Sequence, residues 1–308
     1  MKKYKNLLAL FFCLIPISQS YAIEALKLQK VADNIYAIVG ELGNRTPGNL
    51  GNNATFGLVV TSEGVVLIDS GATYKGAKEI HRLIKSITNK PITTVINTGG
   101  QDHRWLGNGY FKEQGARLIA SRNAVEDQKK RTQDQFIILG NLIGDEVLSG
   151  TDAVYAEQTF DDKFEFELGG VEFEIFHNGQ AHTPGDSFVW LPQKNVMFAG
   201  DIVYTERMLG VGSQSNSKSW IDVYQSMAAY KPEHIVPGHG QATDLASADA
   251  DTYDYLVFLR ESVSAFIEGG GDITEIGSVD QSKFSHLLNY KNLAGRNAQQ
   301  VFTEIEWE

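Results

Sequence analysis

The chain has 308 residues, a formal net charge of −11 and a single cysteine, Cys13. The surplus of acid, without a basic run, argues against nucleic acids and anionic membrane surfaces as partners. One cysteine excludes an internal disulfide, so any metal ligands are expected to be His, Asp or Glu.

The first 22 residues have the pattern of a secretory signal peptide. Three lysines precede an apolar run, and the segment ends in Ser20-Tyr21-Ala22. The apolar run is shorter than the roughly 20 residues of a spanning helix and contains Pro16. We therefore expect cleavage near Ala22, a periplasmic or secreted protein with no stable membrane anchor, and a mature domain over residues 23–308 with a net charge of −14.

Strand and helix patterns alternate along the mature chain. β-Branched and alternating runs predict strands over 26–39, 56–69 (two strands), 92–96, 117–120, 164–177, 188–191, 196–198 and 235–236. Helical spacing predicts helices over 74–87, 105–114, 124–148, 220–230 and 253–268. Residues 40–53, rich in Gly and Asn, predict a mobile loop. No linker or repeat divides the chain, so we expect one α/β domain.

Carboxylates and imidazoles follow several of the predicted strands. Strand ends are where α/β folds place ligands, because the sheet is rigid and the loops adapt. The segments are VVLIDSG, VINTGGQDH, HNGQAHTPGD, VMFAGD and HIVPGHG, and their candidate functional residues are Asp69, Asp102, His103, His182, Asp201 and His239.

The order IDSG, DH, GQAHTPGD, FAGD and PGHG resembles the metallo-β-lactamase superfamily, over nearly the whole mature chain. This resemblance implies a four-layer αββα sandwich with its site at one edge of two packed sheets, and a small-molecule substrate. Among subgroups, the chain is most similar to exported zinc metallohydrolases of the sulfur-oxidation and quinoprotein-associated type. Those chains also end in an arginine-asparagine segment such as Arg296-Asn297.

The His-x-His-x-Asp-His motif of the family is incomplete in this chain. Its aspartate and last histidine match Asp102 and His103. Counting back from Asp102 gives Thr98 and Gly100 in place of the two earlier histidines, and a one-residue gap gives Gly99 and Gly100. Both alignments remove two ligands of the family's first zinc.

The resemblance therefore implies one metal ion. Asp102, His103 and His239 match ligands of the family's second zinc, and Asp201 matches the carboxylate that bridges both ions. His182 matches a ligand of the first zinc and joins the metal only if the site contracts. We expect a hydrolase in which zinc lowers the pKa of bound water to roughly 7 for attack on an ester, amide or thioester-like bond. Asp102 and His182 are the predicted catalytic residues.

Two other functions stay open. If the glycines leave a cavity where the first zinc stands in the family, the chain is a non-catalytic protein that binds a small molecule or sulfur compound. One carboxylate with two histidines also suits mononuclear iron, which would make the chain an enzyme acting on persulfides. The substrate and the oligomeric state do not follow from the sequence.

Four residues outside the ligand set are expected to support the site. The family implies that Asp69 orders the surrounding loops by hydrogen bonding, and Asp186 is expected to brace its own turn. Arg45 and Arg207 lie in segments expected near the site, where they either hold an anionic substrate or face solvent.

Overall fold

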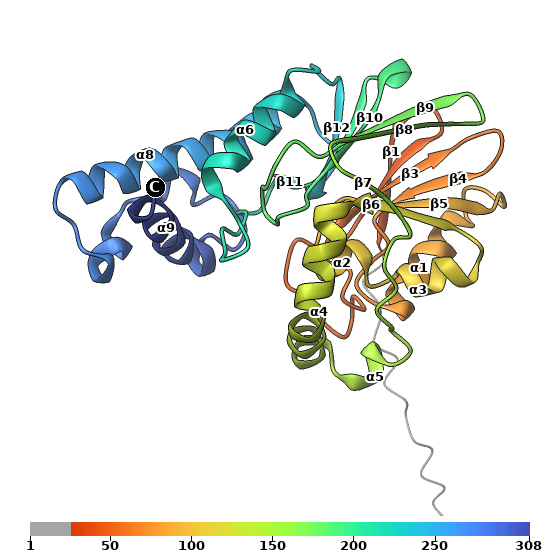
Figure 1. Ribbon diagram of the computed structural model, residues 1–308, viewed down its shortest axis with the longest axis horizontal. Helices are drawn as coiled ribbons and strands as arrows, with labels where there is room; N and C mark the ends of the chain where they lie inside the picture. The colour runs from red at the N-terminus through yellow and green to blue at the C-terminus, as the bar shows by residue number, and fades with distance from the viewer. Residues whose placement is uncertain (1–25) are drawn as a thin grey trace, which may run out of the picture.

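The computed structural model describes residues 26–308, so the predicted signal peptide lies outside the described residues. Within 26–308, no helix is both long enough and apolar enough to cross a membrane. This part of the chain folds into two β-sheets that lie between helices (Figure 1).

The two sheets are mixed. Their strands are β1 (Lys27–Ala32), β2 (Ile35–Val39), β3 (Thr55–Val60), β4 (Val65–Ile68), β5 (Ile92–Asn97), β6 (Arg117–Ser121), β7 (Gln158–Phe160), β8 (Lys163–Leu168), β9 (Val171–Phe176), β10 (Phe188–Leu191), β11 (Val196–Tyr204) and β12 (His234–His239). One sheet has the order β1-β2-β3-β4-β5-β6-β7, and the other has the order β12-β11-β10-β9-β8. Strands β4 to β7 run parallel, as do β11 and β12.

The helices lie mainly on the outer faces of the sheets. They are α1 (Tyr74–Ile84), α2 (Asp102–Trp105), α3 (Asn108–Glu113), α4 (Arg122–Ile143), α5 (Asp145–Leu148), α6 (Ser217–Ala228), α7 (Leu245–Ala248), α8 (Asp254–Glu268) and α9 (Tyr290–Glu306). The short helices η1 (Pro192–Lys194), η2 (Asp249–Tyr253), η3 (Ile273–Ser278) and η4 (Ser282–Phe284) complete them.

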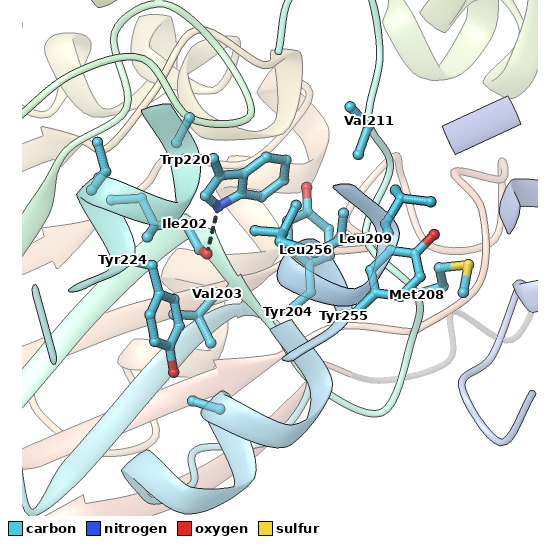
Figure 2. Packing of buried hydrophobic residues seen from close by; sticks show 14 of the residues in the cluster. Ile202, Val203, Tyr204, Met208, Leu209, Val211, Trp220, Tyr224, Tyr255 and Leu256 are labelled. Carbon is cyan, nitrogen blue, oxygen red and sulfur yellow. Dashed lines mark hydrogen bonds between the residues drawn. The ribbon is translucent and has the colours of Figure 1, made fainter. Parts of the chain in front are cut away.

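The alternation of apolar side chains along the strands produces four layers. In β4, Leu67 packs in one core with Ile80 of α1, whereas Ile68 packs in another core with Phe198 of the second sheet. The second sheet has its own outer core, in which Trp220 of α6 is a large buried residue (Figure 2). Helices α6, α8 and α9 lie together beyond this sheet (Figure 1). The predicted αββα sandwich is confirmed.

The carboxyl ends of four strands define one edge of the sandwich. Asp69 directly follows β4, and α2 begins with Asp102 five residues after the end of β5. In the second sheet, His239 ends β12, and Asp201 lies in β11, whose pairing with β12 shifts register on both sides of Gly200. The two sheets therefore bring sequence-distant polar residues to the same edge.

The main differences from the predicted elements lie near the site and at the C-terminus. The strand predicted over 196–198 continues to Tyr204, because Ile202, Val203 and Tyr204 are apolar and enter the outer core. Asp201 therefore lies inside a strand, not in a turn after it. The run 164–177 is a hairpin, β8 and β9, and the helix over 105–114 is divided between α2 and α3. Helix α9 was not predicted, although Ala298 and Val301 bury one of its faces.

Candidate metal centre

Three predicted ligands meet at this edge. His103, Asp201 and His239 each offer a ligand atom, and these atoms lie within 4.8 Å of one another. The Nε2 of His103 lies 3.2 Å from Asp201 Oδ2, and the Nε2 of His239 lies 3.3 Å from Asp201 Oδ1. All three residues are buried. Two imidazoles and a carboxylate form a donor set that suits zinc and other first-row divalent metals.

The hydrogen bonds of His239 leave its inward nitrogen unprotonated. Nδ1 lies 2.8 Å from the carbonyl oxygen of Asn53, which can only accept, and 3.3 Å from Arg207 Nη1, which can only donate. The shorter contact with Asn53 favours a proton on Nδ1. Burial, and then the nearby charge of Arg207, hold the pKa of His239 well below its ordinary value. The lone pair of Nε2 therefore faces the carboxylate of Asp201. A cation between these two acceptors would satisfy both, so the residues fit a bound metal.

Asp201 is held by a fully buried arginine. Arg104 Nε donates to Oδ2 at 3.0 Å, and Arg104 Nη2 donates to Oδ1 at 2.6 Å. Burial alone would raise the pKa of Asp201, but the charge of Arg104, together with His103 and a hydrogen bond with His239, lowers it far below its usual range. Each carboxylate oxygen offers two lone-pair directions, so both oxygens can still bind a metal.

The other end of Arg104 is bonded to Asp69. Arg104 Nη1 donates to Asp69 Oδ2 at 2.8 Å, and the backbone N–H of Thr98 donates to Asp69 Oδ1 at 2.7 Å. Asp69 thereby ties the segment after β5 to the arginine that holds Asp201. The expectation that Asp69 orders the site through hydrogen bonds is confirmed.

His103 has two competing partners at Nδ1. Asp102 Oδ1 lies 3.3 Å from this nitrogen and can only accept, so this contact requires a proton on Nδ1. Arg45 Nη2 lies 2.7 Å from Nδ1 and can only donate, so this contact requires Nδ1 to be unprotonated. When Nδ1 is protonated and donates a hydrogen bond to Asp102, Nε2 presents a lone pair, as in the carboxylate–histidine pairs found around protein metals. When Arg45 donates to Nδ1, the proton lies on Nε2 and points at Asp201. Metal binding through Nε2 therefore favours the contact with Asp102.

Asp102 lies outside the three-residue group. It begins α2, where its Oδ1 accepts the backbone N–H of His103 at 2.7 Å and forms an ion pair with Arg45. Burial opposes ionisation, but Arg45 and His103 hold the pKa of Asp102 far below its ordinary value. This geometry makes Asp102 a carboxylate that orients His103, and its predicted role as a direct ligand stays a prediction.

His182 also lies outside the group, although Asp201 is near enough to act on its charge. The ring packs edge-on against Tyr204 and near Trp220, and Nδ1 lies 3.0 Å from the carbonyl oxygen of Gly210. Burial lowers the pKa of His182 to about 4, although Asp201 acts in the opposite direction. Nδ1 therefore carries the proton, and Nε2 is an acceptor at neutral pH. The roles predicted for His182, as base or as ligand, stay predictions.

The segment that carries these three residues matches a known protein family. The family model of the metallo-β-lactamase superfamily matches residues 51–239, which include His103, Asp201 and His239. The chain belongs to this superfamily.

Relatives and solved structures agree with this placement. Metallo-β-lactamase type 2 from Elizabethkingia meningoseptica is 25% identical over 222 residues, covering 71% of this chain and 80% of that protein. The type 2 enzyme from Bacillus cereus is 28% identical over 193 residues, covering 61% and 68%. A metallo-β-lactamase from Pontibacter korlensis aligns with a TM-score of 0.61 at 21% identity, over 75% of this chain and 99% of its own.

A second structural likeness extends further along the chain. The sec-alkylsulfatase Pisa1 from Pseudomonas sp. aligns with a TM-score of 0.70 at 16% identity, over 90% of this chain. That alignment covers 49% of Pisa1, so this chain spans about half of the alkylsulfatase. At these identities, both structural likenesses concern the fold alone.

Side chains fill the space beside Gly99 and Gly100, the two glycines expected where the superfamily has histidines of its first metal site. A Cβ at Gly99 would collide with the carboxylate of Asp186, and a Cβ at Gly100 would collide with that of Asp127. Asp127 is paired with Arg131 of the same helix. The hypothesis that the glycines open a ligand cavity is therefore wrong at both positions.

Asp186 braces its own turn, as expected. Its Oδ2 accepts the backbone N–H of Thr183 at 2.7 Å, and its Oδ1 lies 2.5 Å from the hydroxyl of Thr183. That hydroxyl also accepts the N–H of Gly100 at 3.1 Å, which links the turn to the segment before α2. Burial, with a smaller contribution from Asp201, raises the pKa of Asp186 to about 8.

The buried Arg104 and the Asp127–Arg131 pair were not predicted from the sequence. Arginine is almost never fully buried without partners, and both partners of Arg104 are distant in sequence. Its one sequence signal is its position directly after Asp102-His103. Asp127 and Arg131 have the i, i+4 spacing of an ordinary exposed helix pair, so the spacing could not show that this pair is buried beside the site.

Proposed function

We propose that this chain is a hydrolase that binds one divalent metal ion, zinc in preference to iron, through His103, Asp201 and His239. The observation that carries the proposal is the pair of acceptors, His239 Nε2 and Asp201 Oδ1, facing each other in a buried site. A metal bound there supplies Lewis-acid activation of water near neutral pH. The relatives named metallo-β-lactamases support hydrolysis as the reaction class.

The residues around the metal have separate tasks. Asp102 accepts a hydrogen bond from Nδ1–H of His103 and fixes its ring, and Arg104 holds both oxygens of Asp201 in place. The Nε2 of His182 is an unprotonated acceptor, suited to a hydrogen bond from the attacking water or from the substrate. The bond cleaved is an ester, amide or thioester-like bond. The subgroup that the sequence resembles, exported hydrolases of the sulfur-oxidation and quinoprotein-associated type, supports the sulfur-containing substrates among these.

Two arginines make an anionic substrate the better candidate. Arg207 Nη1 lies 3.3 Å from the carbonyl oxygen of Gly43 and 3.3 Å from His239 Nδ1, and no ion pair of Arg207 occurs within residues 26–308. The Nε atoms of Arg45 and Arg207 are buried without a partner. Burial lowers the pKa of Arg207, and the nearby charge of Arg45 also lowers it, against opposing effects of Tyr204 and Asp201. A carboxylate, sulfate or phosphate group on the substrate would relieve this repulsion.

A groove beside these arginines gives a substrate room to approach. It has a volume of about 780 Å³, and Asn44 and Glu206, the neighbours of Arg45 and Arg207 in sequence, line it. We place the anionic part of the substrate at the arginines and its remainder along this groove.

The cellular location remains part of the proposal. The signal-peptide pattern of residues 1–22 supports export to the periplasm or the medium. Fractionation of cells that express the full chain, followed by mass determination of the mature N-terminus, tests this, and an uncleaved cytoplasmic chain would contradict it.

The catalytic proposal is tested with paired esters, amides, thioesters and sulfate esters that differ only in carrying a carboxylate or a neutral group. We expect turnover that is lost on chelation, restored by zinc, and abolished in Asp201→Asn but not in Asp134→Asn, an exposed aspartate of α4. Arg207→Ala should reduce the preference for the charged member of each pair. Activity that survives both chelation and Asp201→Asn would refute the proposal, and activity restored by iron alone would favour the persulfide enzyme.

A further inference from the structure

The irregular loop between β11 and α6, residues 205–216, holds His182 in two places. The carbonyl oxygen of Gly210 accepts a hydrogen bond from His182 Nδ1–H at 3.0 Å. The hydroxyl of Ser215 donates to the backbone carbonyl of His182 at 3.0 Å. The orientation of the His182 ring therefore depends on where the loop places the carbonyl of Gly210.

A single side chain brackets Gly210 on both sides. Asn297 of α9 donates from Nδ2 to the carbonyl of Leu209 at 2.9 Å, and its Oδ1 accepts the N–H of Val211 at 2.9 Å. Its Nδ2 also donates to the hydroxyl of Tyr255 at 2.9 Å. Asn297 is fully buried, and Leu209, Val211 and Tyr255 lie in the same packed region (Figure 2).

Packing in this part of the loop comes from the neighbours of Gly210, not from Gly210 itself. Gly210 has no side chain of its own, and nothing lies within 4 Å of the position that its Cβ would take. The side chains of Leu209 and Val211 are buried in the outer core, but the backbone of the glycine between them is intrinsically free to adopt several conformations. The two hydrogen bonds of Asn297 fix the peptides of its neighbours, and with them the direction of the Gly210 carbonyl.

We infer that Asn297 is a positioning residue for His182, acting through the carbonyl of Gly210. By holding the acceptor for Nδ1–H, it keeps the proton on Nδ1 and leaves Nε2 as the acceptor toward the site. Helix α9 lies outside the segment matched by the superfamily model, residues 51–239. The inference rests on the role given to His182 in the proposed function.

The decisive variant is Asn297→Asp in the metal-free full mature chain. Aspartate keeps the shape and the acceptor for Val211 N–H, but it places a second oxygen against the carbonyl of Leu209 and the hydroxyl of Tyr255. The readout is the imidazole N–H signal of His182 in NMR spectra of histidine-labelled protein, assigned by its loss in His182→Gln. Asn292→Ala, an exposed position of the same helix, is the matched control.

We expect the His182 N–H signal to be lost or shifted in Asn297→Asp and unchanged in Asn292→Ala. Once a substrate is known, kcat of Asn297→Asp should fall by roughly 10- to 100-fold with a smaller change in KM, as for a misplaced catalytic group. An unchanged signal in folded Asn297→Asp would overturn the inference. The signal needs no turnover, so this failure is distinct from a failure to find hydrolase activity.

If Asn297→Asp does not fold, hydrogen exchange in the unmodified protein replaces it. The ring N–H of His182 and the backbone N–H of Val211 should then exchange through the same opening event as the amides of α9, such as that of Val301. Exchange of His182 and Val211 at a lower opening free energy than α9 would show that Asn297 does not hold them.

Discussion

Asp186→Asn should stabilise the protein at alkaline pH and not at acidic pH. Asp186 is fully buried, and burial raises its pKa to about 8. The Thr183 hydroxyl donates to Oδ1 of an ionised Asp186, and this bond reverses when Oδ1 is protonated, while Oδ2 accepts the Thr183 N–H in both states. Asparagine reproduces the bonds of the neutral acid with its NH₂ and its carbonyl. The substitution therefore preserves the bonding of the neutral acid and removes only its ionisation.

The size of the effect follows from proton linkage. An unfolded aspartate has a pKa of about 3.9, so the folded value is raised by roughly 4 units. The stability contributed by the neutral form is fully present below the unfolded pKa and is lost as the pH rises through the folded pKa. At about 1.4 kcal/mol per unit, the wild-type chain loses about 4 kcal/mol between pH 5 and pH 8 through this group.

The assay is urea unfolding of chelator-treated wild type and Asp186→Asn at pH 5, 6.5 and 8. The difference in unfolding free energy, variant minus wild type, should grow with pH in favour of the variant. Asp152→Asn, at an exposed position, should show no such trend. A difference that stays flat from pH 5 to pH 8 would mean that folded Asp186 is ionised, which would refute the reasoning.

Three further substitutions test other parts of the site. Gly99→Ala should lower the free energy of unfolding by about 1–3 kcal/mol, because its Cβ meets the Asp186 carboxylate, and unchanged urea unfolding would contradict this. Arg104→Met leaves Asp201 buried without its counter-charge and should cost about 3–5 kcal/mol by the same assay; a cost below 1 kcal/mol would argue against the ion-pair account. Arg45→Ala removes the cation that competes at His103 Nδ1, so zinc affinity measured by chelator competition should rise about tenfold, and weaker binding would show that Arg45 supports the metal.

The layers of the fold were readable from the sequence because they depend on local patterns. Alternation along residues such as Leu67 and Ile68 directs side chains to opposite faces of a strand, and short β-branched runs define the parallel strands. The ends of the strands marked His103, Asp201 and His239 as candidate functional residues, and the resemblance to the metallo-β-lactamase superfamily assigned them as metal ligands. Helix α9 was not predicted because polar residues interrupt its apolar face. Only its packing against α8 and the outer core makes that face recognisable.

The remainder of the site depends on contacts between distant segments. Arg104 is buried because it forms ion pairs with Asp69 and Asp201, which are 35 and 97 residues away in sequence. No local sequence pattern predicts contacts between such distant residues. The glycines at 99 and 100 suggested an empty site, but carboxylates from Asp186 and Asp127 occupy that space. A missing side chain in a sequence therefore predicts a cavity only when the neighbours that could fill it are known.

The central claim is that His103, Asp201 and His239 hold one metal ion. The most direct test is to purify the mature chain without chelator, supplement it with zinc, remove unbound metal, and count metals per chain by elemental mass spectrometry. We expect about one zinc per chain in the wild type and in His182→Ala, and almost none in folded His239→Ala. No bound metal in the wild type, or full retention in His239→Ala, would contradict the account.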